Sequence, residues 1–194
     1  MGAFAAMSLT PIDLCSRALL RVGANGITSF YDGTIEAEIA ANLYPSVRDA
    51  LLSAHPWNFA LKQTELARLA TRPAADFDSV FPLPADCLRV ISAGTNGRGS
   101  GLIYKIAGRE LAANEDNIIL TYVSRAPESI SPPFFDYLLI TFLAAEFCIP
   151  LTESTSRWEA LRKIADLELR RARLIDAQEE TPSALQDFSL VQGR

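Results

Sequence analysis

One segment near the C-terminal end of the sequence is apolar over nearly its whole length. It runs from Phe134 to Leu151 and reads FFDYLLITFLAAEFCIPL. This is about as long as a membrane span, but Asp136, Glu146 and Pro150 interrupt it. A helix that is apolar on every side is typically buried inside a protein. We therefore expect a buried helix here, in a soluble protein.

Two helices are predicted before residue 56. Thr10 is suited to cap the first helix, which should stop at Gly23. The second should begin at Thr34 and end before Pro56, with a kink or break caused by Pro45. Apolar residues recur every four positions in this second helix, and we expect them to share one face: Ile35, Ile39, Leu43, Val47 and Leu51.

Two helices are also predicted at the C-terminal end. The apolar helix should start at residues 131–133 and end at Pro150. The last helix should open near Ser154 and run to about Gln178. Its apolar residues fall on one face: Trp158, Leu161, Ala165, Leu169 and Ala172.

The middle of the chain carries strand and turn signals instead. Pro82 and Pro84 force extended backbone ahead of a predicted strand from Cys87 to Ala93. Turn signals then separate the extended segments 102–107, 110–113 and 117–124, which predict an antiparallel meander. The last of these has apolar residues on both faces, so helices or a neighbouring subunit should cover it on both sides.

These signals predict an α+β fold. Two N-terminal and two C-terminal helices would form a helical body, with an antiparallel β lobe inserted between them. We expect a single domain over residues 8–178, made of N-terminal helices (8–55), a β lobe (58–125) and C-terminal helices (131–178). Residues 179–194 are polar with isolated apolar residues, which predicts an extended C-terminal tail.

Charge and motifs limit the function. The formal net charge of −5 argues against a surface built mainly to bind phosphate backbones. Cys15, Cys87 and Cys148 are far apart and form no CxxC pair, so neither a disulfide framework nor a zinc site is expected. The run GRGSG at 97–101 leads into a predicted strand rather than a helix, which favours a hairpin loop over a phosphate loop. We predict no catalytic, cofactor or metal site.

The stretch AHPWNFA, residues 54–60, holds the only histidine of the chain. A general-base role for this histidine lacks support, because no serine or cysteine beside it forms a nucleophile motif. We interpret the stretch as a structural corner where helix gives way to extended chain, with a tryptophan ring as its anchor. The corner consists of His55, Pro56, Trp57, Asn58 and Phe59.

Five segments, read in order, carry a family resemblance that spans roughly residues 9–177. They are LTPIDLCSRALLRVGANGITSF, LYPSVRDALLSAHPWNFAL, FPLPADCLRVISA, IILTYVSRAPE and FCIPLTES. In this order the chain resembles the bacteriophage head-to-tail connector adaptor family. The family includes podophage tail tubular protein A, tail accessory factor proteins and related adaptors of gene transfer agents. A helix ending in RD-LL-HPWNFA and followed by PLPADCLRV is the most distinctive part of the resemblance.

The resemblance implies a structural role without catalysis. Proteins of this family form a dodecameric ring beneath the portal at the capsid vertex, where the ring prolongs the DNA channel and presents a platform for the next tail component. The expected location is the head–tail junction of the virion, after assembly in the bacterial host cytoplasm, with no cofactor and no membrane. The corner would then join the body to the lobe, with Trp57 and Phe59 setting their relative angle.

The resemblance also implies partners. These are a portal protein, a downstream tail or stopper protein, further copies of the chain in a ring, and double-stranded DNA that passes without sequence specificity. Because C-terminal segments of similar adaptors engage the portal, the candidate portal contacts are Leu185, Phe188, Leu190 and Val191. The candidate contacts with the next tail protein are Gly97, Arg98 and Gly99, and those with a neighbouring subunit or the lumen are the strand 117–124 and Arg170, Arg171 and Arg173.

Two alternatives from other functional classes remain open at this stage. The first is a small hydrolase that uses His55 with Cys87 or a carboxylate, which requires these groups to converge in a cleft. The second is a helical scaffold that binds nucleic acid through residues 170–173, although a basic helix face of this kind is usually just solvated.

Overall fold

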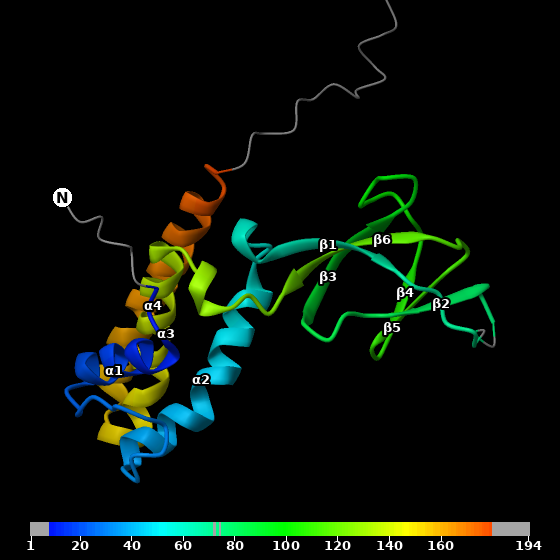
Figure 1. The fold of residues 1–194 in the computed structure, drawn as a ribbon. Coiled ribbons are helices and arrows are strands. Elements are labelled where there is room, and N and C mark those ends of the chain that lie inside the picture. The colour runs from blue at the N-terminus through cyan, green and yellow to red at the C-terminus, as the bar shows by residue number, and fades with distance from the viewer. Residues whose placement is uncertain (1–7, 72, 74, 180–194) are drawn as a thin grey trace, which may run out of the picture.

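The computed structural model describes residues 8–71, 73 and 75–179. Within these residues, four α-helices gather in a helical body, and six strands form a β lobe that projects from its side (Figure 1). The helices are α1 (Pro11–Val22), α2 (Ile35–Ala54), α3 (Pro133–Thr152) and α4 (Thr155–Asp176). The strands are β1 (Leu61–Leu66), β2 (Ser79–Pro82), β3 (Cys87–Gly94), β4 (Lys105–Ala107), β5 (Glu110–Ala113) and β6 (Ile118–Ser124). The predicted α+β fold, with two helices at each end of the chain, is confirmed.

Helix α3 lies at the centre of the helical body. Helices α1, α2 and α4 all pack against it. Within the described residues, α3 is the one helix long and apolar enough to cross a membrane, yet 67% of its 18-residue apolar stretch is buried inside the protein. The prediction of a buried helix is therefore confirmed.

The ends of α1, α3 and α4 follow local signals, with one exception. Thr10 and Asp13 cap α1 reciprocally, and Gly23 ends it with a left-handed φ of 85°. The prediction that α3 ends at Pro150 was wrong, because the helix continues for two residues and stops where Glu153 adopts a φ of 52°. Ser154 then caps α4.

Helix α2 buries the predicted face only in part. A spacing of four residues advances about 40° around a helix at each step, so the five predicted residues drift over most of a half-turn. Accordingly, Ile35 is 68% exposed and Leu51 is buried, with the predicted residues between them half-buried against the body. The small Ala37 and Ala40, together with Tyr44, are buried there as well. Pro45 lies inside a continuous helix, which bends without breaking (Figure 1).

The lobe contains two three-stranded antiparallel sheets, where one meander was predicted. One sheet has the order β1-β6-β3 and the other β2-β5-β4. The predicted hairpin between β4 and β5 is present, with Gly108 at a φ of 59° in its turn. The following turn carries the chain into the other sheet, where β6 pairs with β1 on one side and β3 on the other. Strand β2 was not predicted, and it pairs with β5.

Strand β6 connects the two hydrophobic clusters of the molecule. Its residues Ile118, Leu120 and Tyr122 belong to the cluster inside the lobe, whereas Val123 belongs to the cluster of the helical body. The predicted cover on both faces is thus supplied by this chain itself. Because both edges of β6 are paired and most of its side chains are buried, the strand does not offer the subunit contact that the sequence suggested.

The loop after β3 folds back onto the sheet at Gly94. A Cβ atom added there would lie 2.2 Å from the carbonyl oxygen of Arg98 and 2.5 Å from the backbone of Ser100. We predict that Gly94→Ala lowers the free energy of unfolding by about 2 kcal/mol, because backbone atoms cannot move aside cheaply. Urea unfolding measures this change. The control is Gly26→Ala, where the nearest atom lies 3.4 Å from the added Cβ, and an equal effect of both variants would contradict the prediction.

Candidate functional site

The corner between α2 and β1 is built around the buried ring of Trp57. This side chain is fully buried, and its indole N–H donates a hydrogen bond of 2.9 Å to the carbonyl oxygen of Leu51 in the last turn of α2. The ring packs edge-on against Phe135, with centroids 5.3 Å apart, and Phe59 contacts the same phenylalanine at 5.0 Å. The corner residues therefore pack against the first turn of α3.

A buried carboxylate ties the corner to the end of α4. Asp176 is 2% exposed and accepts a hydrogen bond of 3.0 Å from the backbone N–H of Asn58. Its other oxygen lies 3.2 Å from Nε2 of His55, and the Asn58 side chain donates to the Asp176 carbonyl at 2.7 Å. The ring of His55 also packs edge-on against Trp57 at 4.7 Å. These contacts hold two of the five corner residues to α4, His55 and Asn58, and hold His55 to Trp57.

Sequence reasoning missed Asp176. The residue falls on the apolar face predicted for the last helix, since it follows Ala172 by four positions and Ala165 by eleven. A single acidic residue on an otherwise apolar helix face needs a buried partner. That signal was present in the sequence, although it does not identify the partner.

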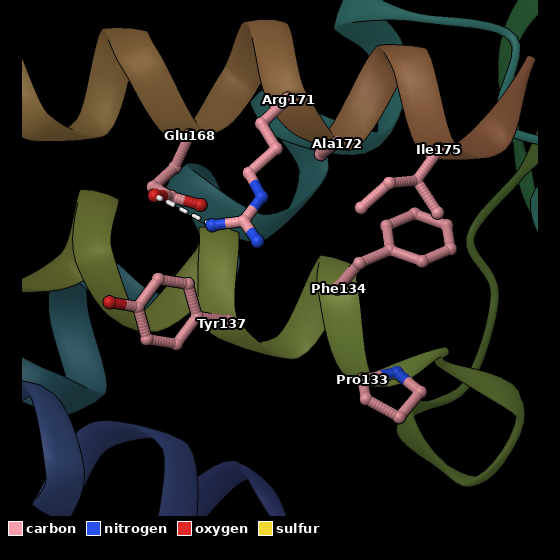
Figure 2. Close-up of a pocket in the computed structure, with 7 residues that line it drawn as sticks. All are labelled: Pro133, Phe134, Tyr137, Glu168, Arg171, Ala172 and Ile175. Atoms are coloured by element: carbon pink, nitrogen blue, oxygen red, sulfur yellow. Dashed lines mark ion pairs between the residues drawn. The ribbon is translucent and has the colours of Figure 1, made fainter.

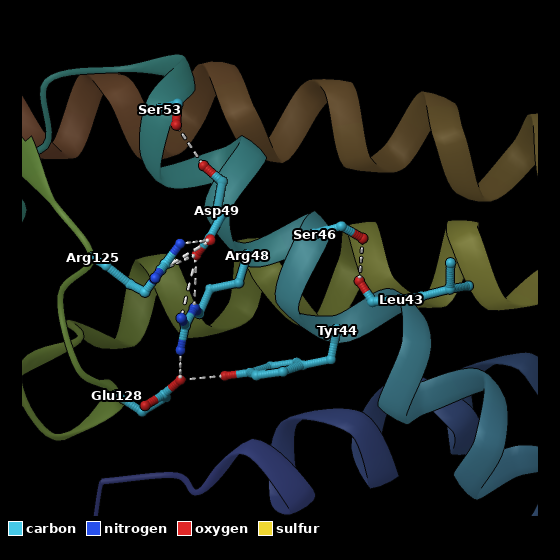
Figure 3. Close-up of polar contacts among 8 residues, drawn as sticks. All are labelled: Leu43, Tyr44, Ser46, Arg48, Asp49, Ser53, Arg125 and Glu128. Carbon is cyan, nitrogen blue, oxygen red and sulfur yellow. Dashed lines mark hydrogen bonds and ion pairs between the residues drawn. The ribbon is translucent and has the colours of Figure 1, made fainter. Parts of the chain in front are cut away.

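A second set of polar contacts joins α2 to the segment that follows β6 (Figure 3). The Tyr44 hydroxyl donates a hydrogen bond of 2.6 Å to Glu128, and the guanidinium of Arg48 donates to the same carboxylate oxygen. Arg125 donates to the Asp49 carboxylate at 2.7 and 3.0 Å. Burial alone would raise the pKa of Glu128, but the hydrogen bonds from Tyr44 and Arg48 outweigh it and hold this pKa below its usual value.

These contacts continue into the lobe through Asp86. Lys62 donates a hydrogen bond of 2.8 Å to this carboxylate and holds its pKa below the usual value, and Tyr122 donates to its other oxygen. The backbone N–H of Arg125 donates to the Asp86 carbonyl at 2.7 Å. Arg89 on β3 in turn donates to the Ser53 carbonyl near the end of α2. Charge-assisted bonds of this kind fix direction as well as distance, so they set one orientation of the lobe on the body.

His55 and Cys87 are used in different parts of the structure. His55 packs against Trp57 of the helical cluster, whereas Cys87 is buried in the lobe cluster at the start of β3. Burial raises the pKa of the Cys87 thiol, which disfavours the reactive thiolate. The convergence that a hydrolase with these two residues requires is not found. His55 does meet a carboxylate, but Asp176 is engaged in holding the corner.

The three arginines of α4 do not act as one patch. Arg170 and Arg171 are exposed, and Arg171 forms an ion pair of 3.9 Å with Glu168. Arg173 instead turns to the corner, where it donates a hydrogen bond of 3.3 Å to the Ala54 carbonyl at the end of α2. Arg171 borders a groove of about 310 Å³ between α3 and α4, which is lined mainly by Phe134, Tyr137, Ala172 and Ile175 (Figure 2).

The Gly97–Gly99 loop has an exposed tip on a fixed base. Gly97 and Arg98 are exposed. The carbonyl of Gly99 accepts hydrogen bonds from Ser92 at 2.7 Å and from Thr121 at 3.1 Å. Arg98 is therefore presented to solvent on a loop anchored to the sheet.

The remaining candidates concern the tail and metal ions. Leu185, Phe188, Leu190 and Val191 lie outside the described residues. Within the described part of the chain, no group of three or more His, Cys, Asp or Glu side chains could hold a metal ion.

We predict that Trp57→Ala lowers the free energy of unfolding by about 3 to 5 kcal/mol, because it leaves a cavity among the corner, α2 and α3. Denaturant unfolding followed by circular dichroism gives this value. The control is Trp158→Ala, which truncates the half-buried tryptophan of α4 and should cost clearly less. An unchanged melting temperature for Trp57→Ala would contradict a structural role for the corner.

We predict that Glu128→Gln lowers the free energy of unfolding by about 2 kcal/mol at pH 7, because charge-assisted hydrogen bonds to Arg48 and Tyr44 are weakened. The folded-state pKa of Glu128 lies below its ordinary value of 4.5. Its contribution is therefore complete above pH 4.5 and is lost as the pH falls through the folded-state pKa. Urea unfolding between pH 7 and pH 3 should show the two proteins converge in acid. Exposed Glu159→Gln serves as the control, and a pH-independent gap for Glu128→Gln would refute the assignment.

Comparison of the sequence with protein families and with curated proteins identifies no relative. No protein-family model matches the chain, and no curated protein is significantly similar to it. We therefore infer a function from the corner, from the polar contacts that join the body to the lobe, and from the resemblance carried by the sequence segments.

Proposed function

We propose that the protein is a structural virion component, a head-to-tail adaptor that forms a ring under the portal, extends the DNA channel and provides the platform for tail attachment. It acts without catalysis and without a cofactor. Its partners are the portal, the downstream tail or stopper protein, further copies of itself and the double-stranded DNA that slides through the ring.

One observation supports this proposal most directly. Segments that carry the family resemblance, although far apart in the chain, meet where the body joins the lobe. Arg48 and Asp49 from the second segment contact Glu128 and Arg125 from the fourth. Asp86 from the third segment accepts a hydrogen bond from the backbone of Arg125. The distinctive residues of the resemblance thus serve one purpose, a fixed joint between two dissimilar parts.

A fixed joint suits a ring subunit with a different partner at each end. A ring closes only when every copy repeats the same contact at the same rotation, so small changes of subunit shape accumulate around it. The buried Trp57 ring and the carboxylates of Asp176, Glu128 and Asp86 limit such changes. An acidic subunit also disfavours tight non-specific binding of DNA, which has to pass through the channel.

The test is to mix the purified protein with the portal protein encoded nearest to its gene, and to examine the mixture by negative-stain imaging and native mass spectrometry. We expect a ring of about twelve copies stacked on the portal. The matched variant lacks residues 181–194, and should remain folded by circular dichroism but lose portal binding. Absence of any portal complex across salt and protein concentrations would refute the adaptor function, whereas binding by the shortened variant would refute only the tail contact.

A further inference from the structure

Helix α4 carries a row of apolar side chains on the side that faces solvent. Ile164, Leu167 and Leu174 are 46%, 59% and 66% exposed. Together with exposed Ala160, Arg171 and Gln178 they follow alternating spacings of four and three residues. This is the spacing of a helix seam that packs against a partner. We call this row the α4 ridge.

The opposite side of the body carries a trough between α2 and α3. Two adjoining hollows of about 430 and 290 Å³ share Glu146 as a lining residue. Their apolar lining comes mainly from Ile39, Leu43, Val47, Leu51, Phe142 and Pro150. Glu38 and Glu146 add carboxylates to this apolar surface, and Arg162 adds one guanidinium, so acidic groups outnumber basic ones. An apolar groove with a few charged groups along it is suited to receive an amphipathic helix.

The ridge cannot reach the trough of its own chain. Leu169 of α4 lines the trough, and Leu167 lies about 160° around the helix from it, at 100° per residue. The two surfaces therefore face opposite ways. A ridge that enters a trough must come from another molecule, and each molecule then keeps one ridge and one trough free for the next copy.

The charges of the two surfaces are complementary. Lys163 and Arg170 flank the ridge, and among the described residues neither forms an ion pair with a carboxylate. Glu38 is exposed and is likewise unpaired within the described part of the chain. Glu146 lies 3.4 Å from Arg162, an exposed pair of modest strength that leaves the second carboxylate oxygen available. A basic apolar ridge and an acidic apolar trough on one chain favour a second copy of that chain as the occupant.

We propose that the protein associates head to tail, with the α4 ridge of one copy seated in the α2–α3 trough of the next. This inference rests on the ring proposed above and assigns the two surfaces that build it. Because the contact joins two different surfaces, it generates rings or open chains rather than a closed pair.

The experiment uses two complementary variants of the full chain. The ridge variant is Leu167→Glu with Leu174→Glu, and the trough variant is Glu38→Arg with Asn42→Arg; all four positions are exposed. Sedimentation velocity across a wide concentration range should show the wild-type protein associating, and each variant weakened about thirtyfold or more. The control is Leu20→Glu, which changes an equally exposed leucine of α1 and should associate like wild type. Circular dichroism melting checks that all variants are folded.

Mixing the two variants gives the decisive result. Each retains one intact surface, so an equimolar mixture should form a pair of twice the 21.2 kDa subunit mass through the intact ridge and the intact trough. Failure to form this pair, while wild type associates, would overturn the proposed surfaces. A wild-type protein that stays monomeric at all concentrations would also overturn the inference, yet leave the adaptor function to be decided by portal binding.

The last residues of the chain are a competing occupant of the ridge. Hydrogen exchange on a shortened chain that ends at Glu179 distinguishes this occupant from a second copy. Unchanged association of this shortened chain, with unchanged protection of α4 amides in its monomer, supports the second copy. Loss of α4 protection in the shortened monomer would assign the ridge to residues 180–194 and overturn the inference.

Discussion

The need to bury α3 is the constraint on which the rest of the structure depends. A helix that is apolar on nearly every side has no face to give to water, so other elements must surround it. Helices α1, α2 and α4 do so along its length. At its first turn, Phe134 and Phe135 extend the same apolar surface beyond the helices, and the ring of Trp57 covers them. The corner is thus the continuation of the helical core into the connection with the lobe.

Directional contacts then select one arrangement of the parts. Apolar packing is strong but tolerates small rotations, whereas a carboxylate that accepts several hydrogen bonds does not. Asp176 holds the corner to α4, Glu128 holds α2 to the segment after the lobe, and Asp86 joins Lys62 of β1 to Tyr122 of β6 within the lobe. Each carboxylate connects segments far apart in sequence. Some of the acidic residues that give the chain its negative net charge therefore also fix how the parts of the molecule are arranged.

Features set by neighbouring residues could be predicted from the sequence, and features set by distant partners could not. The cap of α1 depends on Thr10 and Asp13 alone, and the end of α2 depends on Pro56, so both were predicted correctly. The buried face of α2 was predicted only in part, because the larger apolar residues drift around the helix and small alanines beside them also contact the body. The division into two sheets depends on β6 pairing with β1 and β3 rather than β5, a choice between partners that local patterns do not encode.

The same contrast applies to the candidate site. The corner residues were recognised from a proline and a tryptophan next to each other, but their polar partner Asp176 lies 118 positions after Asn58. The network of Arg48, Asp49, Arg125 and Glu128 was present in the segments that carry the resemblance, although nothing local linked them. Arg173 was grouped with Arg170 and Arg171 because all three are basic. Its hydrogen bond to the Ala54 carbonyl depends on where α2 ends against α4.

The pairing of β1 with β6 has a consequence for how such a molecule can diversify. Leu61, the first residue of the lobe, lies opposite Val123 near its last, so the chain enters and leaves the lobe side by side. Apart from residues that contact the body, such as Asp86 and Arg89, the segments between these two residues can change in length or sequence while the two stems stay paired and the helices keep their packing. The lobe is therefore an exchangeable module on a fixed mount, and descendants of one ancestor could change what the lobe touches without redesigning the helical body.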